Sequence, residues 1–315
     1  MRNILPAVVL SLAIAAPVTN AACGGDDGSQ FDGGGGGGEG GGGDTDGSNP
    51  FGTMDGGGNG DGSGNGDGAS CYAPVDMYIM QDRSGSMGTD CNVGDMTNSK
   101  WCHSVNALAG YFKSPAAAGN AAAIQFFRVP NHSQALCATG AQYSTPLAPM
   151  GPPAYATLPT NSFDTILNAQ SPNGLTPTEA AIRGLTGFTA GNRRGGRVTI
   201  GILITDGDPT ECDTNLMNLS NLLKAHLQAT TIRTYVIGMN GATFANLEQI
   251  AQGGGAPLHP DVVGGLTDAC GDGPGPCRHW NVGDGNPQAF IAALAAIQES
   301  ADGCKDGGGV INPPN

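Results

Sequence analysis

Three oxygen-bearing side chains stand at alternate positions directly after an apolar stretch. Residues 75–80 are almost wholly apolar and predict a buried strand, and Asp82, Ser84 and Ser86 follow it. One carboxylate and two hydroxyls on a short loop are hard oxygen donors, which are the ligands that Mg²⁺ prefers. Gly85 allows such a loop to turn tightly. The same residue types also occur in solvated loops that cap a following helix, so this loop alone leaves both interpretations open.

Two further segments carry oxygen donors that could join this loop. Asp206 comes just after the apolar run 198–204, and Thr176 precedes a helical pattern that begins at Thr178. Taken singly, Asp206 fits a turn and Thr176 fits a helix cap. In open α/β sheets, however, the carboxyl ends of the strands form the edge at which ligands bind. Together the three segments predict one site at that edge.

The elements that must position these residues alternate along the chain. Apolar runs predict strands, and a helical period of apolar residues predicts the helices between them. The strands are expected over 75–80, 122–129, 198–204 and 233–237, and the helices over 100–112, 163–169, 178–188, 216–227, 244–251 and 289–297. This alternation predicts a Rossmann-like, doubly wound α/β fold with a mostly parallel central sheet and helices on both faces. The basic cluster at 193–197 is expected to be a solvated loop, with anion binding as the alternative.

The first 70 residues have the composition of export and tether segments. Residues 1–22 combine the basic Arg2 with an apolar run that is shorter than a membrane span, which predicts a secretion signal. Residues 23–70 consist largely of Gly, Asp, Asn and Ser, and therefore predict a disordered, flexible tether that has no core. The folded domain is expected over 71–304, and residues 305–315 are expected to form a disordered tail.

The cysteines of the chain predict an exported, disulfide-bonded protein. There are nine, and Cys23 stands directly after the small residues Ala21 and Ala22, as in the lipidation box of bacterial lipoproteins, although Asn20 replaces the usual aliphatic residue. Ordinary cleavage near Ala22 is the alternative. A lipidated Cys23 leaves an even number for disulfides. Positions along the chain suggest the pairs Cys71–Cys304, Cys91–Cys102, Cys137–Cys212 and Cys270–Cys277, one of many possible sets.

Composition and motifs exclude several classes of protein. The formal net charge is −14, and the tether contributes nine acidic residues and no Lys or Arg, so the folded part is only mildly acidic. No basic stripe predicts nucleic-acid binding. The sequence contains no H-E-x-x-H zinc motif, no G-x-S-x-G elbow and no phosphate loop, and its five histidines are scattered. The sequence therefore predicts a protein that is not an enzyme.

The motifs resemble those of one family over about residues 71–304. Asp82, Ser84 and Ser86, then Thr176, then Asp206 in a T-D-G turn match the metal-ion-dependent adhesion site of von Willebrand factor type A domains, also called integrin I-like domains. The resemblance implies that Ser84 and Ser86 bind Mg²⁺, or Mn²⁺ or Ca²⁺, directly. It implies that the other three bind directly or through water, with one position left for an acidic side chain of a partner.

The resemblance also implies a function and a location. The domain would be a metal-dependent protein-binding or adhesion module displayed at the bacterial cell envelope, and its ligand would be a protein with an exposed Asp or Glu. Contact with the membrane would be made only through lipid on Cys23. An outer-membrane lipoprotein or a cell-surface protein is expected, with secretion as the alternative. A second interpretation makes the domain a structural or assembly factor of the envelope, in which the metal only stabilises the loops.

Overall fold

The structure is a computed structural model that describes residues 73–130, 136–137, 140–151, 160–271, 273–283 and 286–301. The predicted secretion signal, the tether with Cys23, the C-terminal tail and the predicted pair Cys71–Cys304 lie outside these residues. Within the described part of the chain, none of the helices combines the length and the apolar character that a membrane span requires.

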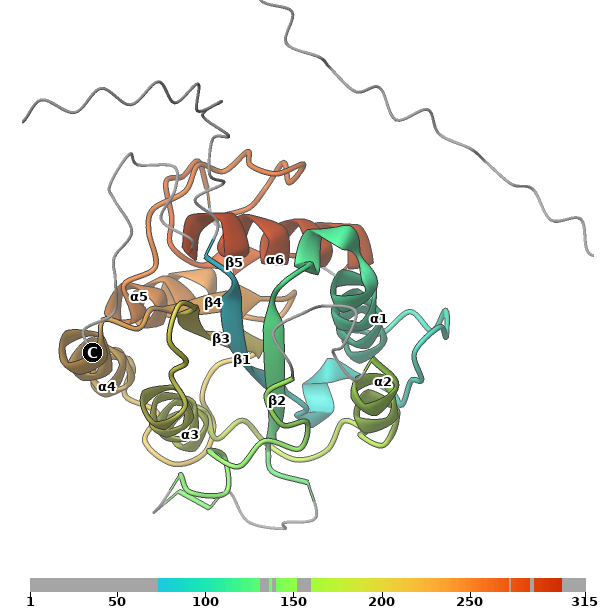
Figure 1. Cartoon of the computed structure of the whole chain (residues 1–315), viewed down its shortest axis with the longest axis horizontal. Coiled ribbons are helices and arrows are strands. Elements are labelled where there is room, and N and C mark those ends of the chain that lie inside the picture. The colour runs from blue at the N-terminus through green and yellow to red at the C-terminus, as the bar shows by residue number, and fades with distance from the viewer. Residues whose placement is uncertain are drawn as a thin grey trace, which may run out of the picture. The chain divides into compact units, whose positions relative to one another are not determined.

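A parallel sheet forms the centre of the domain, and in the described residues its strand order is β2-β1-β3-β4-β5 (Figure 1). The strands are β1 (Val75–Asp82), β2 (Ala121–Phe127), β3 (Val198–Thr205), β4 (Thr234–Gly238) and β5 (Trp280–Asn281). The helices are α1 (Lys100–Lys113), α2 (Thr160–Asn168), α3 (Thr178–Gly191), α4 (Leu216–Thr230), α5 (Phe244–Gly254) and α6 (Pro287–Ala301), with short 3₁₀ helices η1 (Gly85–Met87) and η2 (Pro115–Ala117).

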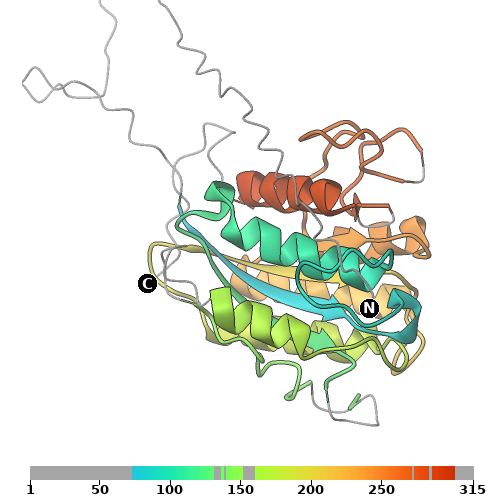
Figure 2. The same cartoon turned by 90° about the vertical axis from the view of Figure 1, so that its right-hand side faces the viewer.

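Helices cover both faces of this sheet. Helices α1, α2 and α6 pack on one face, and α3, α4 and α5 pack on the other (Figure 1). Figure 2 shows α1 and α6 side by side along the strands. Strand β1 is buried on both sides: Met77 and Ile79 belong to the core under α1 and α6, whereas Tyr78 and Met80 belong to the core under α3. The predicted doubly wound α/β fold is confirmed.

The predicted helices and strands all occur, with shifted ends. Strand β1 extends to Asp82, so this residue ends a strand rather than beginning a loop. Strand β5 was not predicted, because two residues are too few to show an alternating or continuous apolar pattern. The backbone of Ala148 also bridges Ile124 of β2 in the antiparallel sense at the outer edge of the sheet.

The basic cluster before β3 is largely exposed, as predicted, but two of its arginines turn back to a buried carboxylate, which was not predicted. Arg194 and Arg197 both pair with the carboxylate of Asp76, which is fully buried near the start of β1. Arg194 donates from Nε to Asp76 Oδ2 at 2.6 Å, and Arg197 donates from Nη2 to the carbonyl oxygen of Gly119 at 2.9 Å. A buried carboxylate is costly without such partners, which is why these two side chains fold back over the amino-terminal end of the sheet.

Candidate metal site

Asp82 lies at the carboxyl end of β1 with its side chain completely buried. Its Oδ1 accepts a hydrogen bond from the backbone N–H of Ser84 at 2.7 Å, and its Oδ2 accepts one from the hydroxyl of Thr205 at 2.7 Å. Thr205 is the last residue of β3, the strand beside β1. The carboxylate is therefore held in one orientation by groups from two adjacent strand ends.

The two serines connect Asp82 to Asp206 through a chain of hydrogen bonds. The hydroxyl of Ser86 donates to Asp206 Oδ1 at 2.9 Å. The hydroxyls of Ser84 and Ser86 are 2.9 Å apart, and because Ser86 gives its proton to the carboxylate, Ser84 is the donor in this pair. Asp206 directly follows β3 and is buried. These contacts gather the oxygen atoms of three predicted ligands in one place.

Thr176 lies in a loop that is tied to both of the others. The N–H of Gly85 donates to the carbonyl oxygen of Gly174 at 3.0 Å, which joins this loop to the Asp82–Ser86 segment. The N–H of Thr176 donates to the hydroxyl of Thr210 at 2.9 Å, which joins this loop to the segment that follows Asp206. The hydroxyl of Thr176 lies 4.0 Å from the point that a Cβ on Gly207 would occupy. It is therefore next to the turn that carries Asp206.

The electrostatics of the site favour a bound cation. Asp82 and Asp206 are two buried carboxylates in one site, and burial together with the negative charge of Asp206 raises the pKa of Asp82 to about 7. Within the described residues, Asp206 Oδ2 has no hydrogen-bond partner and is contacted by the ammonium of Lys100 as an ion pair. Two carboxylates and three hydroxyls form an all-oxygen donor set that suits Mg²⁺, Mn²⁺ or Ca²⁺. The residues present therefore fit a hard divalent cation, which would remove the repulsion between the two carboxylates.

Two residues of the site were not found from the sequence. Thr205 fixes Asp82, and Lys100 at the start of α1 forms an ion pair with Asp206 Oδ2. The position of Thr205 directly before Asp206 could have indicated its role, because a residue at the carboxyl end of β3 lies at the edge of the sheet where the predicted ligands gather. Nothing in the spacing of Lys100 pointed to Asp206, since the pair depends on how α1 packs beside β3.

The raised pKa of Asp82 makes the site sensitive to pH. Because the pKa in the folded state lies above the ordinary value of 3.8, the free energy of unfolding without metal should fall as the pH rises through about 7. Metal binding needs the ionised carboxylate, so Mg²⁺ affinity should rise by up to about tenfold per pH unit and level off near neutrality. Thermal unfolding in EDTA and in Mg²⁺ across this pH range measures both effects. An Asp82→Asn variant should lose the pH slope seen in EDTA, and an unchanged slope would contradict the assignment.

Disulfides brace the loops around the site. The structure joins Cys91 to Cys102, Cys137 to Cys212, and Cys270 to Cys277, three of the pairs that were suggested from chain position. The first links the segment after Ser86 to the first turn of α1. The second holds the loop that follows Asp206. Two of the three therefore restrain segments on either side of the candidate metal ligands.

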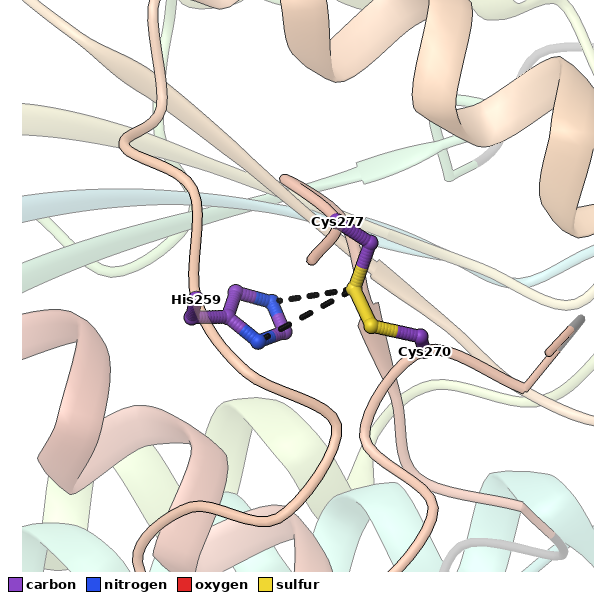
Figure 3. Close-up of side chains that lie close together, drawn as sticks. All are labelled: His259, Cys270 and Cys277. Atoms are coloured by element: carbon purple, nitrogen blue, oxygen red, sulfur yellow. Dashed lines mark hydrogen bonds between the residues drawn. A yellow bond between two sulfur atoms is a disulfide. The ribbon is translucent and has the colours of Figure 1, made fainter. Parts of the chain in front are cut away.

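A second group of potential metal ligands lies away from this site. His259, Cys270 and Cys277 are buried close together, with Cys277 Sγ 3.6 Å from His259 Nε2 (Figure 3). The two sulfurs are bonded to each other, so neither is available as a thiolate. The His259 ring contacts the carbonyl oxygen of His279 through Nε2 at 2.7 Å and stacks on Trp280. With the disulfide formed, these three residues form a packed structural cluster that holds the loop before β5 in place.

Comparisons with known proteins found matches among solved structures. No protein-family profile and no curated relative matches the chain. Solved von Willebrand factor domains are among the structural matches. The von Willebrand factor domain of the type V pili tip protein Mfa5 from Porphyromonas gingivalis is 12% identical with a TM-score of 0.46, over 72% of this chain and 96% of that domain.

Two other matches are larger proteins. The pilus adhesin SpaC from Lactobacillus rhamnosus GG is 14% identical with a TM-score of 0.49, over 72% of this chain and 31% of SpaC. Proximal thread matrix protein 1 from the mussel byssus is 14% identical with a TM-score of 0.45, over 73% of this chain and 47% of that protein, so the chain spans about half of its length. A further structure of the mussel protein has a zinc-occupied metal-ion-dependent adhesion motif.

Proposed function

We propose that the domain is a metal-ion-dependent protein-binding or adhesion module. In this proposal Asp82, Ser84, Ser86, Thr176 and Asp206 hold a divalent cation, with Mg²⁺ the expected ion. An exposed Asp or Glu of a partner protein completes the coordination. Bound metal would supply a positive centre that attracts this carboxylate, a strong charge-assisted contact. The domain would bind its partner and catalyse no reaction.

One observation carries this proposal. Residues from three separate segments, each at or near the carboxyl edge of the sheet, bring oxygen donors together, and the hydrogen-bonded chain Ser84–Ser86–Asp206 links two of these segments. A set of turn or capping residues would point toward backbone N–H groups, as Ser99 does when it accepts from Cys102 N at 3.1 Å. Ser86 instead points its hydroxyl at the buried carboxylate of Asp206, so the two side chains could bind one cation together.

The proposal places the module outside the cytoplasm. Disulfides persist mainly in oxidising compartments, and three of them lie among the described residues. We extend this to an exported protein whose Cys23 carries lipid at the cell envelope, with residues 23–70 as the tether that gives the domain its reach. An outer-membrane or cell-surface location follows from that anchor.

A capture experiment tests the proposed function. The wild-type chain, immobilised on beads, should retain an envelope protein in Mg²⁺ and release it in EDTA, because the partner's carboxylate needs the metal. The double variant Ser84→Ala/Ser86→Ala should lose this capture while its circular dichroism spectrum stays unchanged. The retained proteins are identified by mass spectrometry.

Two results would count against this function. Capture that persists in EDTA, or that the double variant retains, would contradict the metal-dependent mechanism. Thermal stabilisation by Mg²⁺ without any capture would instead support the structural or assembly role, in which the metal only holds the loops together.

A further inference from the structure

The ammonium of Lys100 is held in a cradle beside the candidate metal ligands. It pairs with Asp206 Oδ2 and donates to the carbonyl oxygen of Asn240 at 2.8 Å. Gly241, with φ of +104°, leaves room for it, since a Cβ there would lie 3.3 Å from Lys100 Nζ and 3.0 Å from the carbonyl oxygen of Asp206. The ammonium of Lys100 therefore pairs with the carboxylate of Asp206, which a bound metal would also use.

A groove begins at the same place. It has a volume of about 510 Å³ and is lined by Ser86, a predicted metal ligand, and by Lys100 and His103 on the first turn of α1. The other lining residues are neutral, and no Asp or Glu is among them. The side chain of Lys100 is 22% exposed, whereas that of Asp206 is 0% exposed. Lys100 therefore lies at the boundary between the buried ligand set and this groove.

Lys100 and a divalent cation compete for the same oxygen atom. An ammonium and a divalent ion repel each other at short range in a partly buried site, so each weakens the binding of the other to the carboxylate of Asp206. The long lysine side chain has several rotatable bonds, and the groove offers it a solvated position close by. Metal binding would therefore displace the ammonium from Asp206 and add it to the groove wall.

We propose that Lys100 is a second anchor for the partner, in addition to the metal, and that metal binding makes it available. This inference rests on the proposed function and specifies the partner: its binding segment carries two carboxylates. One completes the metal coordination at Ser86, and the other pairs with Lys100 in the groove. A partner segment with a single acidic residue would bind more weakly, and the groove would reject a basic segment.

The metal alone tests the competition. Removing the ammonium in Lys100→Met should raise Mg²⁺ affinity at least about fivefold in isothermal titration calorimetry, a coupling typical of two linked sites. Lys113→Met is the matched control, because Lys113 is on the same helix and also forms an ion pair, with Asp164. Its Mg²⁺ affinity should equal that of the wild type. Equal affinities of Lys100→Met and wild type would overturn the competition.

Two peptides test the second anchor. One has the form Asp-Gly-Gly-Glu and the other Asp-Gly-Gly-Gln, both with blocked ends, and binding to the Mg²⁺-loaded chain is measured by NMR titration. The wild type should prefer the first peptide by about fivefold or more, as expected for one added charge pair in a partly desolvated groove. Lys100→Met should bind both peptides equally, and Lys100→Arg should restore the preference. A preference that survives in Lys100→Met would overturn the proposal.

The results also separate this proposal from the proposed function. If the wild type binds no Mg²⁺, the metal-dependent function itself fails. If it binds Mg²⁺ and both peptides equally, with the same affinity in Lys100→Met, the metal site stands and the role of Lys100 is wrong.

Discussion

Replacing Asp206 by alanine should lower the affinity of the domain for Mg²⁺ by about a hundredfold or more, because the site loses one of its two charged ligands. The variant also removes two contacts that the Asp206 carboxylate makes within the protein. Asp206 Oδ1 accepts the proton of Ser86, and Oδ2 carries the ion pair with Lys100. Without this carboxylate, Ser86 has no fixed orientation, and the ammonium of Lys100 remains near the site without a counter-charge. Isothermal titration calorimetry with Mg²⁺ measures the effect.

Asp208 provides a matched control for this prediction. It lies two residues further along the same turn and carries the same charge, but its carboxylate accepts hydrogen bonds from the side chains of Thr243 and Asn246 at 2.9 and 3.0 Å. Asp208→Ala should therefore keep Mg²⁺ affinity close to that of the wild type. Similar affinities for the Asp206→Ala and Asp208→Ala variants would show that the carboxylate of Asp206 is not a ligand. Circular dichroism spectra of both variants establish that the fold is retained.

The ligand set could be proposed from the sequence because its chemistry is local. Asp82 and Asp206 each come at the end of an apolar strand, and parallel strands bring their carboxyl ends to one edge. Given that topology, the order of residue types along the chain is enough to place carboxylates and hydroxyls together. The structure agrees with this placement for Asp82, Ser84, Ser86 and Asp206, which share hydrogen bonds, and it puts Thr176 beside Gly207.

The partners of the buried carboxylates could not be found in this way. Lys100 and Asp206 meet because α1 packs beside β1 and β3, and the pairing of Asp76 with Arg194 and Arg197 depends on how the loop before β3 folds back. A pattern of residue types shows which groups carry charge but not which pairs meet. The sequence therefore predicts the arginine cluster as a solvated loop and does not show that two of its arginines pair with the buried Asp76.

Replacing Asp76 by alanine should lower the free energy of unfolding by about 3–5 kcal/mol, the usual cost of removing one partner from a buried ion pair. Asp76 is fully buried, and the side chain of Arg197 is only 8% exposed, so the variant leaves a buried guanidinium without its carboxylate. For a domain of this size the melting temperature should fall by roughly 6–20 °C. Urea unfolding at fixed pH, followed by circular dichroism, gives the free energy directly.

Two further variants distinguish a broken pair from a general loss of packing. Removing both charges in Asp76→Ala/Arg197→Met should cost less than the sum of the two single variants, with a coupling of about 1–3 kcal/mol. Arg194→Ala should cost only about 1 kcal/mol or less, because its side chain is 31% exposed and water can replace part of its contacts. Additive single and double variants would contradict a buried ion pair.

Asp76→Ala should also leave Mg²⁺ affinity unchanged under conditions where the variant is folded, since Asp76 and Asp82 lie at opposite ends of β1. Buried carboxylates lie at both ends of β1, and their negative charge is balanced differently at the two ends. At the amino-terminal end, Arg194 and Arg197 permanently neutralise the buried carboxylate of Asp76, and this ion pair stabilises the folded state. At the carboxyl end, the carboxylates of Asp82 and Asp206 are neutralised only in part, by the partly exposed Lys100, which pairs with Asp206. A cation that can be exchanged is what a binding site requires, so loss of Mg²⁺ binding in the folded Asp76→Ala variant would contradict this division of roles.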